Sequence, residues 1–275
     1  MTENDELANA YNKALKLEKS GDFAQAALFY QKCLVLDPSD ICGASIRLAS
    51  MGATSSPNKA PDAYVATLFD QHADDFDDIL TGNLGYAVPM QVASLLNIDA
   101  PGPYSRLLDL GCGTGLSGMM LQEMCEHATG VDLSENMIDK SDERACYDEL
   151  FVNEVVHFLE EWVKSSDPNH QPFDLIVATD VLPYIGALEP LFDGIRSNAQ
   201  NSARLVFSSE TMADKDMAGA SWRVTPNQRF AHSKTYLHEM CNRAGFSNIT
   251  HFEEIVVRSE QGQPIPGHLL IADRH

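Results

Sequence analysis

The fold of this chain is decided by one stretch, Arg106-Leu-Leu-Asp-Leu-Gly-Cys-Gly-Thr-Gly-Leu116. Its first half is an apolar run interrupted by Asp109, which is typical of a buried parallel strand with an acid near its carboxyl end. Three glycines at alternate positions, Gly111, Gly113 and Gly115, then predict a tight turn that lets a ligand approach the backbone. A helix predicted over residues 116–126 offers its amino end to the same ligand.

A second acid, Asp132, ends the next predicted strand, residues 128–131, about twenty residues further along. In a doubly wound α/β fold, this position accepts hydrogen bonds from ribose hydroxyl groups. The glycine spacing excludes two other nucleotide sites. A dinucleotide fingerprint requires its third glycine where Leu116 stands, and a P-loop requires a Gly-Lys-Ser/Thr, which does not follow. The two acids and the glycines together argue against a turn that serves no ligand.

The pattern Asp-x-Gly-x-Gly-x-Gly of residues 109–115, followed by Asp132, resembles the cofactor loop of class I S-adenosylmethionine-dependent methyltransferases. The resemblance covers residues 63–275 and narrows to predicted methyltransferases of bacterial type with a tetratricopeptide-like leader. The further marks are Leu68-Phe-Asp-x-x-Ala73, Leu84-Gly-Tyr86, Asp180-Val-Leu-Pro-Tyr184, Arg229-Phe-Ala-His-Ser233 and Pro264-x-Pro-Gly267. The resemblance implies an α/β fold: a doubly wound, Rossmann-like sheet of seven strands, the last one antiparallel, with a small N-terminal all-α appendage.

The same resemblance implies S-adenosylmethionine as the cofactor and assigns the residues that bind it. These are Asp109, Gly111, Cys112, Gly113, Gly115, Asp132, Leu133, Met137, Glu154 and Thr179. Glu154 follows the predicted third strand, residues 148–152, where the family places an acid on the adenine amino group. Met137 is left open between an adenine contact and a core residue.

A helix predicted over residues 63–80 precedes the first strand of the sheet. In the enzymes that this chain resembles, such a helix closes over the cofactor and an aromatic side chain or a histidine contacts the ligand. The candidates here are Phe69, His72 and Phe76, and packing against the edge of the sheet is an equal alternative for each of them.

Strands and helices continue to alternate after Asp132, which predicts further parallel strands at 173–177 and 203–208. A polar connection, residues 211–233, follows. So long a connection is usually a lid or a binding loop, so we expect it to roof a substrate pocket. Its centre predicts two short strands about a Pro-Asn turn. After a helix at 234–244, two strands joined by a short turn predict an antiparallel pair, 249–258 and 268–272.

Polar residues at the carboxyl ends of the central strands and in this connection are the candidates for chemistry. Asp180, Tyr184 and His232 are predicted to be catalytic, and Arg229 and Glu210 to bind substrate. A histidine near neutral pKa is suited to proton transfer, and an arginine to a substrate carboxylate. The alternatives are a histidine that only makes a local hydrogen bond and an arginine that pairs with a surface acid.

Residues 1–51 predict a helical leader, 52–62 a linker, and 63–275 the S-adenosylmethionine-binding domain. The leader resembles the second half of a tetratricopeptide repeat at Gly21, Phe23, Ala26, Tyr30, Cys33 and Pro38. One such repeat cannot bury its own apolar face, since about three are needed for stability. We therefore expect a helical cap on the main domain, with the docking of a protein partner as the alternative.

Composition and net charge limit the partners, metal sites and cellular locations that the sequence predicts. The chain has 275 residues and a formal net charge of −21, which disfavours nucleic acid as a partner because phosphates would be repelled. Six cysteines show no Cys-x-x-Cys pairing and no metal-ligand spacing, as in a reduced cytoplasmic protein, and no metal site is predicted. Neither a signal peptide nor an apolar run of membrane-spanning length is present, so we expect a cytoplasmic protein without a membrane partner.

Three functions remain open. The leading one is a methyltransferase that acts on a small-molecule acceptor by in-line transfer, which depends mainly on positioning and the exclusion of water. The second is a protein methyltransferase or assembly factor that recruits its target through the leader. The third is a protein that binds S-adenosylmethionine without catalysis.

Overall fold

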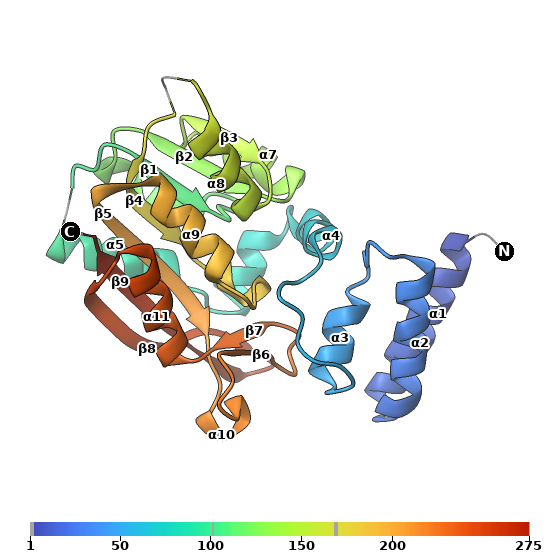
Figure 1. Cartoon of the computed structure of the whole chain (residues 1–275). Coiled ribbons are helices and arrows are strands. Elements are labelled where there is room, and N and C mark those ends of the chain that lie inside the picture. The colour runs from blue at the N-terminus through green and yellow to red at the C-terminus, as the bar shows by residue number, and fades with distance from the viewer. Residues whose placement is uncertain (1–2, 101, 168–169, 275) are drawn as a thin grey trace.

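The computed structural model describes residues 3–100, 102–167 and 170–274. One twisted sheet is covered by helices on both faces, and the N-terminal helices stand together to one side of it (Figure 1). The leader, which the sequence predicted to be helical, consists of α1 (Glu3–Lys19), α2 (Phe23–Leu36) and α3 (Ala44–Ser50).

Seven strands build the main part of the sheet. They are β1 (Leu107–Leu110), β2 (Ala128–Asp132), β3 (Glu149–Val152), β4 (Phe173–Ala178), β5 (Ala199–Glu210), β8 (Asn248–Glu260) and β9 (Gln263–Asp273). Their spatial order is β3-β2-β1-β4-β5-β9-β8, and β9 runs antiparallel to both of its neighbours. The predicted Rossmann-like sheet with an antiparallel last strand is confirmed.

A short hairpin extends this sheet, which has nine strands in the described part of the chain rather than the predicted seven. The hairpin consists of β6 (Trp222–Val224) and β7 (Phe230–His232). It lies within residues 211–233, where two short strands were predicted, after the single turn of α10 (Asp214–Met217). Ala231 of β7 pairs in parallel with Glu210 at the carboxyl end of β5. On β5, Glu210 lies beyond Phe207, which is the last residue that pairs with β4. The hairpin therefore stands at the edge where the parallel strands end.

Apolar side chains are buried by the helices α5 (Val88–Asp99), α6 (Leu116–Leu121), α7 (Glu135–Glu143), α8 (Val155–Lys164), α9 (Glu189–Asn198) and α11 (Lys234–Ala244). Helix α4 (Asp62–His72) has no buried residue. Leu159, Phe192 and Leu237 bring α8, α9 and α11 into one core cluster, while Leu96 of α5 belongs to the cluster on the other face.

The predicted helix at 63–80 is not continuous. Helix α4 ends at His72, and after a turn the chain forms a π-helix, Asp78–Asn83. One acid on each side of the break is hydrogen-bonded to a different loop. Asp70 accepts a hydrogen bond from Ser134, and Asp77 accepts one from Thr114. A straight helix facing these acids toward solvent would make neither contact.

Residues 52–62, predicted as a linker, are hydrogen-bonded to the loop after β4. The carbonyl of Asn58 accepts the N–H groups of Gly186 and Ala187, both at 2.8 Å, and the N–H of Ala60 donates to the carbonyl of Tyr184 at 2.9 Å. The division of the chain at 51 and 63 remains a prediction.

Candidate active site

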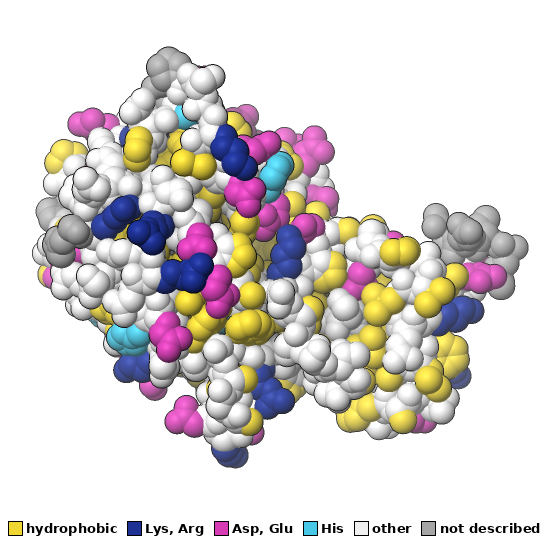
Figure 2. Space-filling view, viewed as in Figure 1, with side chains coloured by type: hydrophobic (Ala, Val, Ile, Leu, Met, Phe, Trp, Pro, Cys, Tyr) yellow, Lys and Arg dark blue, Asp and Glu magenta, His cyan; other side chains and the backbone are white. Residues whose placement is uncertain are grey.

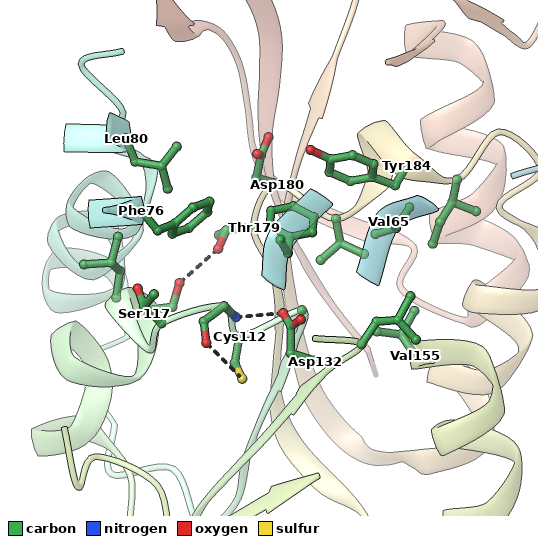
Figure 3. Close-up of a pocket in the computed structure, with 18 of the residues that line it drawn as sticks. Val65, Phe76, Leu80, Cys112, Ser117, Asp132, Val155, Thr179, Asp180 and Tyr184 are labelled. Carbon is green, nitrogen blue, oxygen red and sulfur yellow. Dashed lines mark hydrogen bonds between the residues drawn. The ribbon is translucent and has the colours of Figure 1, made fainter. Parts of the chain in front are cut away.

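A cleft of about 120 Å³ lies at the carboxyl ends of β1, β2 and β4. Figure 3 shows Asp132 and Cys112 on one side of it, with Phe76 and Leu80 across the space and Asp180 and Tyr184 at its far end. Of the predicted cofactor residues, seven line this cleft: Gly111, Cys112, Gly113, Asp132, Leu133, Glu154 and Thr179. The predicted catalytic residues Asp180 and Tyr184 line it as well.

The glycine turn after β1 brings bare backbone to the cleft. Gly111 has φ +69°, and a Cβ on it would lie 2.2 Å from Cγ2 of Val181, so this position excludes any side chain. Gly113 has φ +54°, and a Cβ there would make an ordinary contact with Phe76, at 3.8 Å. The turn thus presents backbone without side chains to the cleft, and Phe76 faces it at contact distance from such a Cβ.

Asp132 is held rigidly at the end of β2. Its Oδ2 accepts the N–H of Gly113 and its Oδ1 accepts the N–H of Ser134, both at 2.9 Å. Burial raises the pKa of Asp132, while these backbone donors oppose the rise. The side chain lines the cleft, where a carboxylate fixed in this way can accept hydrogen bonds from neighbouring hydroxyl groups.

Three predicted cofactor residues lie outside the cleft lining that the structure describes. Asp109 is fully buried beneath it and accepts a hydrogen bond from the hydroxyl of Tyr147 at 2.6 Å. Burial raises the pKa of Asp109 to about 7, against the effect of the Tyr147 hydrogen bond. Gly115 is the left-handed N-cap of α6, and Met137 is a fully buried core residue. These residues support the site but do not reach the ligand space.

The charge of the cleft selects among ligands. Among the described residues that line it, Lys59 is the one cation, and Asp62, Asp132, Glu154 and Asp180 are anions. Lys59 is itself paired with Asp62 at 2.7 Å. A pyrophosphate would be repelled here, whereas a nucleoside without phosphate and with a positive charge would be attracted. S-adenosylmethionine has this chemistry, so the residues fit it.

A second cavity, of about 280 Å³, adjoins the first. Five residues line both cavities: Phe69, Phe76, Leu80, Asp180 and Tyr184. Asn227, Gln228 and Arg229, from the turn of the β6–β7 hairpin, line the second one, and so does His72 at the end of α4. The long connection therefore contributes its turn to this cavity, which is the candidate acceptor pocket.

Arg229 is fully engaged by protein groups in this second cavity. Its Nε donates to Glu210 at 2.5 Å, its Nη1 to the hydroxyl of Tyr184, and its Nη2 to Asp180. The guanidinium carbon also lies 4.6 Å from the centre of the Tyr184 ring. Burial opposes the charge of Arg229, but Asp180 and Glu210 outweigh it and raise its pKa further.

Sequence reasoning missed a second arginine, Arg258 of β8. Its Nη1 donates to Glu210, and its Nε and Nη2 donate to Glu260 at 2.9 and 2.5 Å. Arg258 and Glu260 line the second cavity, while Glu210 lies beneath both arginines and lines neither cavity in the described part of the chain. Glu210 therefore positions the arginines, which corrects its predicted role as a substrate ligand. The sequence signal that could have revealed Arg258 is its position, together with an acid, at the end of a predicted strand.

His232 is wrongly predicted as a catalytic residue. It is fully buried in β7, and its Nε2 lies 2.8 Å from the carbonyl of Ile185. Burial lowers its pKa to about 4, although hydrogen bonding to the backbone at Ile185 opposes this. Because it is absent from the described linings of both cavities, His232 cannot take a proton from an acceptor there.

Asp180 is the carboxylate at the junction of the two cavities. It has a left-handed backbone with φ +62°, unusual for a residue other than glycine, and its N–H donates to the Ser208 hydroxyl at 2.9 Å. Tyr184 stands beside it, and burial raises the pKa of Tyr184, so its hydroxyl stays protonated.

This fold and this cleft define the class of the protein: a Rossmann-like α/β protein with its ligand site at the carboxyl ends of the central strands. Residues 86–251, more than half of the chain, match a family model described as "Methyltransferase domain". The chain belongs to this family.

Solved methyltransferase structures share the fold. Magnesium protoporphyrin IX methyltransferase from Synechocystis PCC 6803 with bound S-adenosylmethionine is 16% identical, with a TM-score of 0.55 over 78% of this chain and 97% of that one. N-methyltransferase NodS from Bradyrhizobium japonicum WM9, in complex with S-adenosylhomocysteine, is 16% identical, with a TM-score of 0.53 over 76% and 97%. Among curated sequences, the ubiquinone biosynthesis O-methyltransferase of Coxiella burnetii is 28% identical over 103 residues, which are 38% of this chain and 42% of that protein.

Proposed function

We propose that this protein binds S-adenosylmethionine in the first cavity and transfers its methyl group to a small molecule in the second. The observation that carries the proposal is the meeting of a negatively charged cleft at the carboxyl ends of the central strands with an adjoining cavity at Asp180 and Tyr184. The open second cavity also argues against the non-catalytic alternative, because no described side chain fills the space next to the junction.

The residues have distinct roles in this proposal. S-adenosylmethionine supplies an electrophilic methyl group when it is bound. Asp132 accepts hydrogen bonds from the ribose, and Gly113 gives the ligand access to the backbone. Phe69 and Phe76 cover the junction and exclude water, which favours transfer because it requires desolvation and alignment rather than a protein nucleophile. Asp180 orients the acceptor and takes its proton where the acceptor carries one.

Calorimetric titration tests the cofactor. S-adenosylhomocysteine should bind and NAD should not. Asp132→Ala should weaken S-adenosylhomocysteine binding by roughly 1–3 kcal/mol, the scale of a buried polar group left unpaired. Asp139→Ala, an exposed acid on α7, is the matched control and should bind like the parent protein. Binding of NAD without binding of S-adenosylhomocysteine would overturn the proposal.

A second candidate, the recruitment of a protein partner by the tetratricopeptide-like leader, has one observation in its favour. Figure 2 shows hydrophobic side chains on the surface of the leader helices, and on α2 the side chains of Leu28 and Val35 are 57% and 79% exposed. A partner purified with the intact protein but lost from a Leu28→Ser, Val35→Ser variant would support this role. If methylation of small molecules persists in that variant, the two functions are separable.

The location of the protein in the cytoplasm also remains a proposal. No helix in the described part of the chain is long and apolar enough to cross a membrane.

A further inference from the structure

We propose that the second cavity binds an organic amine with an apolar, ring-sized body, and that Asp180 holds its nitrogen. This inference rests on the proposed function, since it names the class of acceptor for the same site. It follows from the apolar walls of the cavity, from the way its arginines are occupied, and from the charge that remains accessible.

The walls of the cavity are aromatic and aliphatic. They are formed by Tyr64, Leu68, Phe69, Phe76, Ile79, Leu80, Leu84 and Tyr184. These side chains come from α4, from the π-helix region and from the loop after β4, and they surround the space between Asp180 and the hairpin turn. Such walls stabilise a flat or compact apolar body by excluding water from it.

The polar end of the cavity holds two arginines that are already paired with protein carboxylates. Each of the three guanidinium nitrogens of Arg229 is bonded to Glu210, Tyr184 or Asp180. Each of the three of Arg258 is bonded to Glu210 or Glu260. A carboxylate or phosphate on the acceptor would have to compete with these protein carboxylates for the two guanidinium groups, so the cluster does not resemble an open anion site.

Glu260 and Asp180 are the more accessible members of this cluster, whereas Glu210 is buried. The side chain of Glu260 is 30% exposed and that of Asp180 is 17% exposed, whereas Arg258 is 3% exposed and Arg229 is 12% exposed. Two guanidinium groups face three carboxylates, Asp180, Glu210 and Glu260, so the cluster has a net negative charge. A protonated amine is therefore attracted to it, and the overall charge of −21 steers cations to the protein.

The position of Asp180 connects binding to chemistry. It is the carboxylate that lines both cavities, so an ammonium group bound to it lies at the boundary with the cofactor cleft. The nitrogen must lose one proton before it can attack, and the Asp180 carboxylate accepts it. The nitrogen lone pair then forms the new nitrogen–carbon bond to the methyl group, and the electron pair of the broken carbon–sulfur bond remains on sulfur.

Calorimetry with three matched probes tests the inference on the full-length protein saturated with S-adenosylhomocysteine. The probes are 2-phenylethylamine, 2-phenylethanol and 3-phenylpropanoate, which share a phenylethyl body and differ in the charge of the end group. The amine should bind roughly tenfold tighter than the alcohol, the scale for one partly buried charge pair, and the carboxylate should bind most weakly.

Substitutions of the cavity carboxylates test which of them causes the preference for the amine. Asp180→Asn should remove most of the preference for the amine, and Glu260→Gln should reduce it with less disturbance of Arg229. Glu253→Gln, an exposed acid on the same strand β8, should retain the preference of the parent protein. Equal or tighter binding of the carboxylate, no binding by any of the three probes, or an unchanged preference in both cavity variants would overturn the inference. Since saturation with S-adenosylhomocysteine is established first, each of these results leaves the proposed function standing, whereas failure to saturate refutes the proposed function itself.

Discussion

At the scale of single residues, the sequence predicted what depends on local spacing and not what depends on burial. Gly111, Gly113 and Asp132 line the cleft because a strand, a tight turn and a following strand fix their positions within some twenty residues. His232 has the residue type of a general base, but β7 places it in the core against the carbonyl of Ile185. Nothing near His232 in the sequence indicates that burial, because it is imposed by packing against β6, α11 and the loop after β4.

Asp109 provides a prediction of pH dependence at this scale. Burial raises its pKa to about 7, above the ordinary value of 3.8, so the folded state holds this proton more tightly than the unfolded state. The stabilisation is full below pH 4 and is lost as the pH rises to 7, with a slope of up to about 1.4 kcal/mol per pH unit. Asp109→Asn should remove this slope from the free energy of unfolding, as measured by urea denaturation between pH 5 and pH 8.

The control for that measurement is Asp142→Asn, an exposed acid on α7, which should keep the slope of the parent protein. Asp132 also has a raised pKa and contributes in the same direction, so the comparison between variant and parent isolates Asp109. Parallel curves for the parent protein and Asp109→Asn would show that Asp109 is ionised in the folded protein throughout this range.

At the scale of elements, the apolar face of residues 63–80 was predicted correctly, since Phe69, Phe76 and Leu80 all face the cavities. The acids of the same segment contact loops of the sheet. Asp70 accepts a hydrogen bond from the hydroxyl of Ser134 at 2.5 Å, and Asp77 accepts one from that of Thr114 at 2.6 Å. These partners are 64 and 37 residues away in the chain, which is why periodicity could not reveal them.

These contacts predict that α4 and the π-helix form a cover that is fastened over the cofactor. Asp70→Ala removes the bond to Ser134 but leaves that hydroxyl as the N-cap of α7, where it accepts the N–H of Met137. S-adenosylhomocysteine should bind roughly 2- to 10-fold more weakly, as expected for one hydrogen bond, with the loss mainly in a faster dissociation rate. Amide hydrogen exchange in residues 62–83 should also become faster.

Asp75→Ala is the control for the cover, because Asp75 lies on the same segment and its side chain is exposed. Its affinity and exchange rates should match those of the parent protein. Equal effects of the two substitutions would mean that the segment responds to lost charge in general and not to release from the loop after β2.

At the scale of the whole molecule, the leader and the main domain share a core. Ile46 and Ala49 of α3 belong to one buried cluster with Val224 and Phe230 of the β6–β7 hairpin. Tyr64, which lines the second cavity, lies so close to Gly43 that a Cβ there would be 2.7 Å from its ring. The composition of residues 52–62 predicted a linker, but composition says nothing about the hydrogen bonds that its backbone makes with distant loops. We therefore expect the leader to shape the acceptor cavity and to unfold together with the sheet.

The substitution Ile46→Ala tests whether the leader and the sheet unfold together. The fully buried side chain fills space between the leader and the hairpin, so its truncation should lower the free energy of unfolding by roughly 2–5 kcal/mol. Tryptophan fluorescence, which includes Trp222 packed against the same cluster, and circular dichroism should shift to lower urea concentration together. Ile41→Ala, at an exposed isoleucine of the leader, should change stability by less than about 0.5 kcal/mol. If Ile46→Ala instead produces a separate early transition without a shift in fluorescence, the leader is an independent unit that does not support the acceptor cavity.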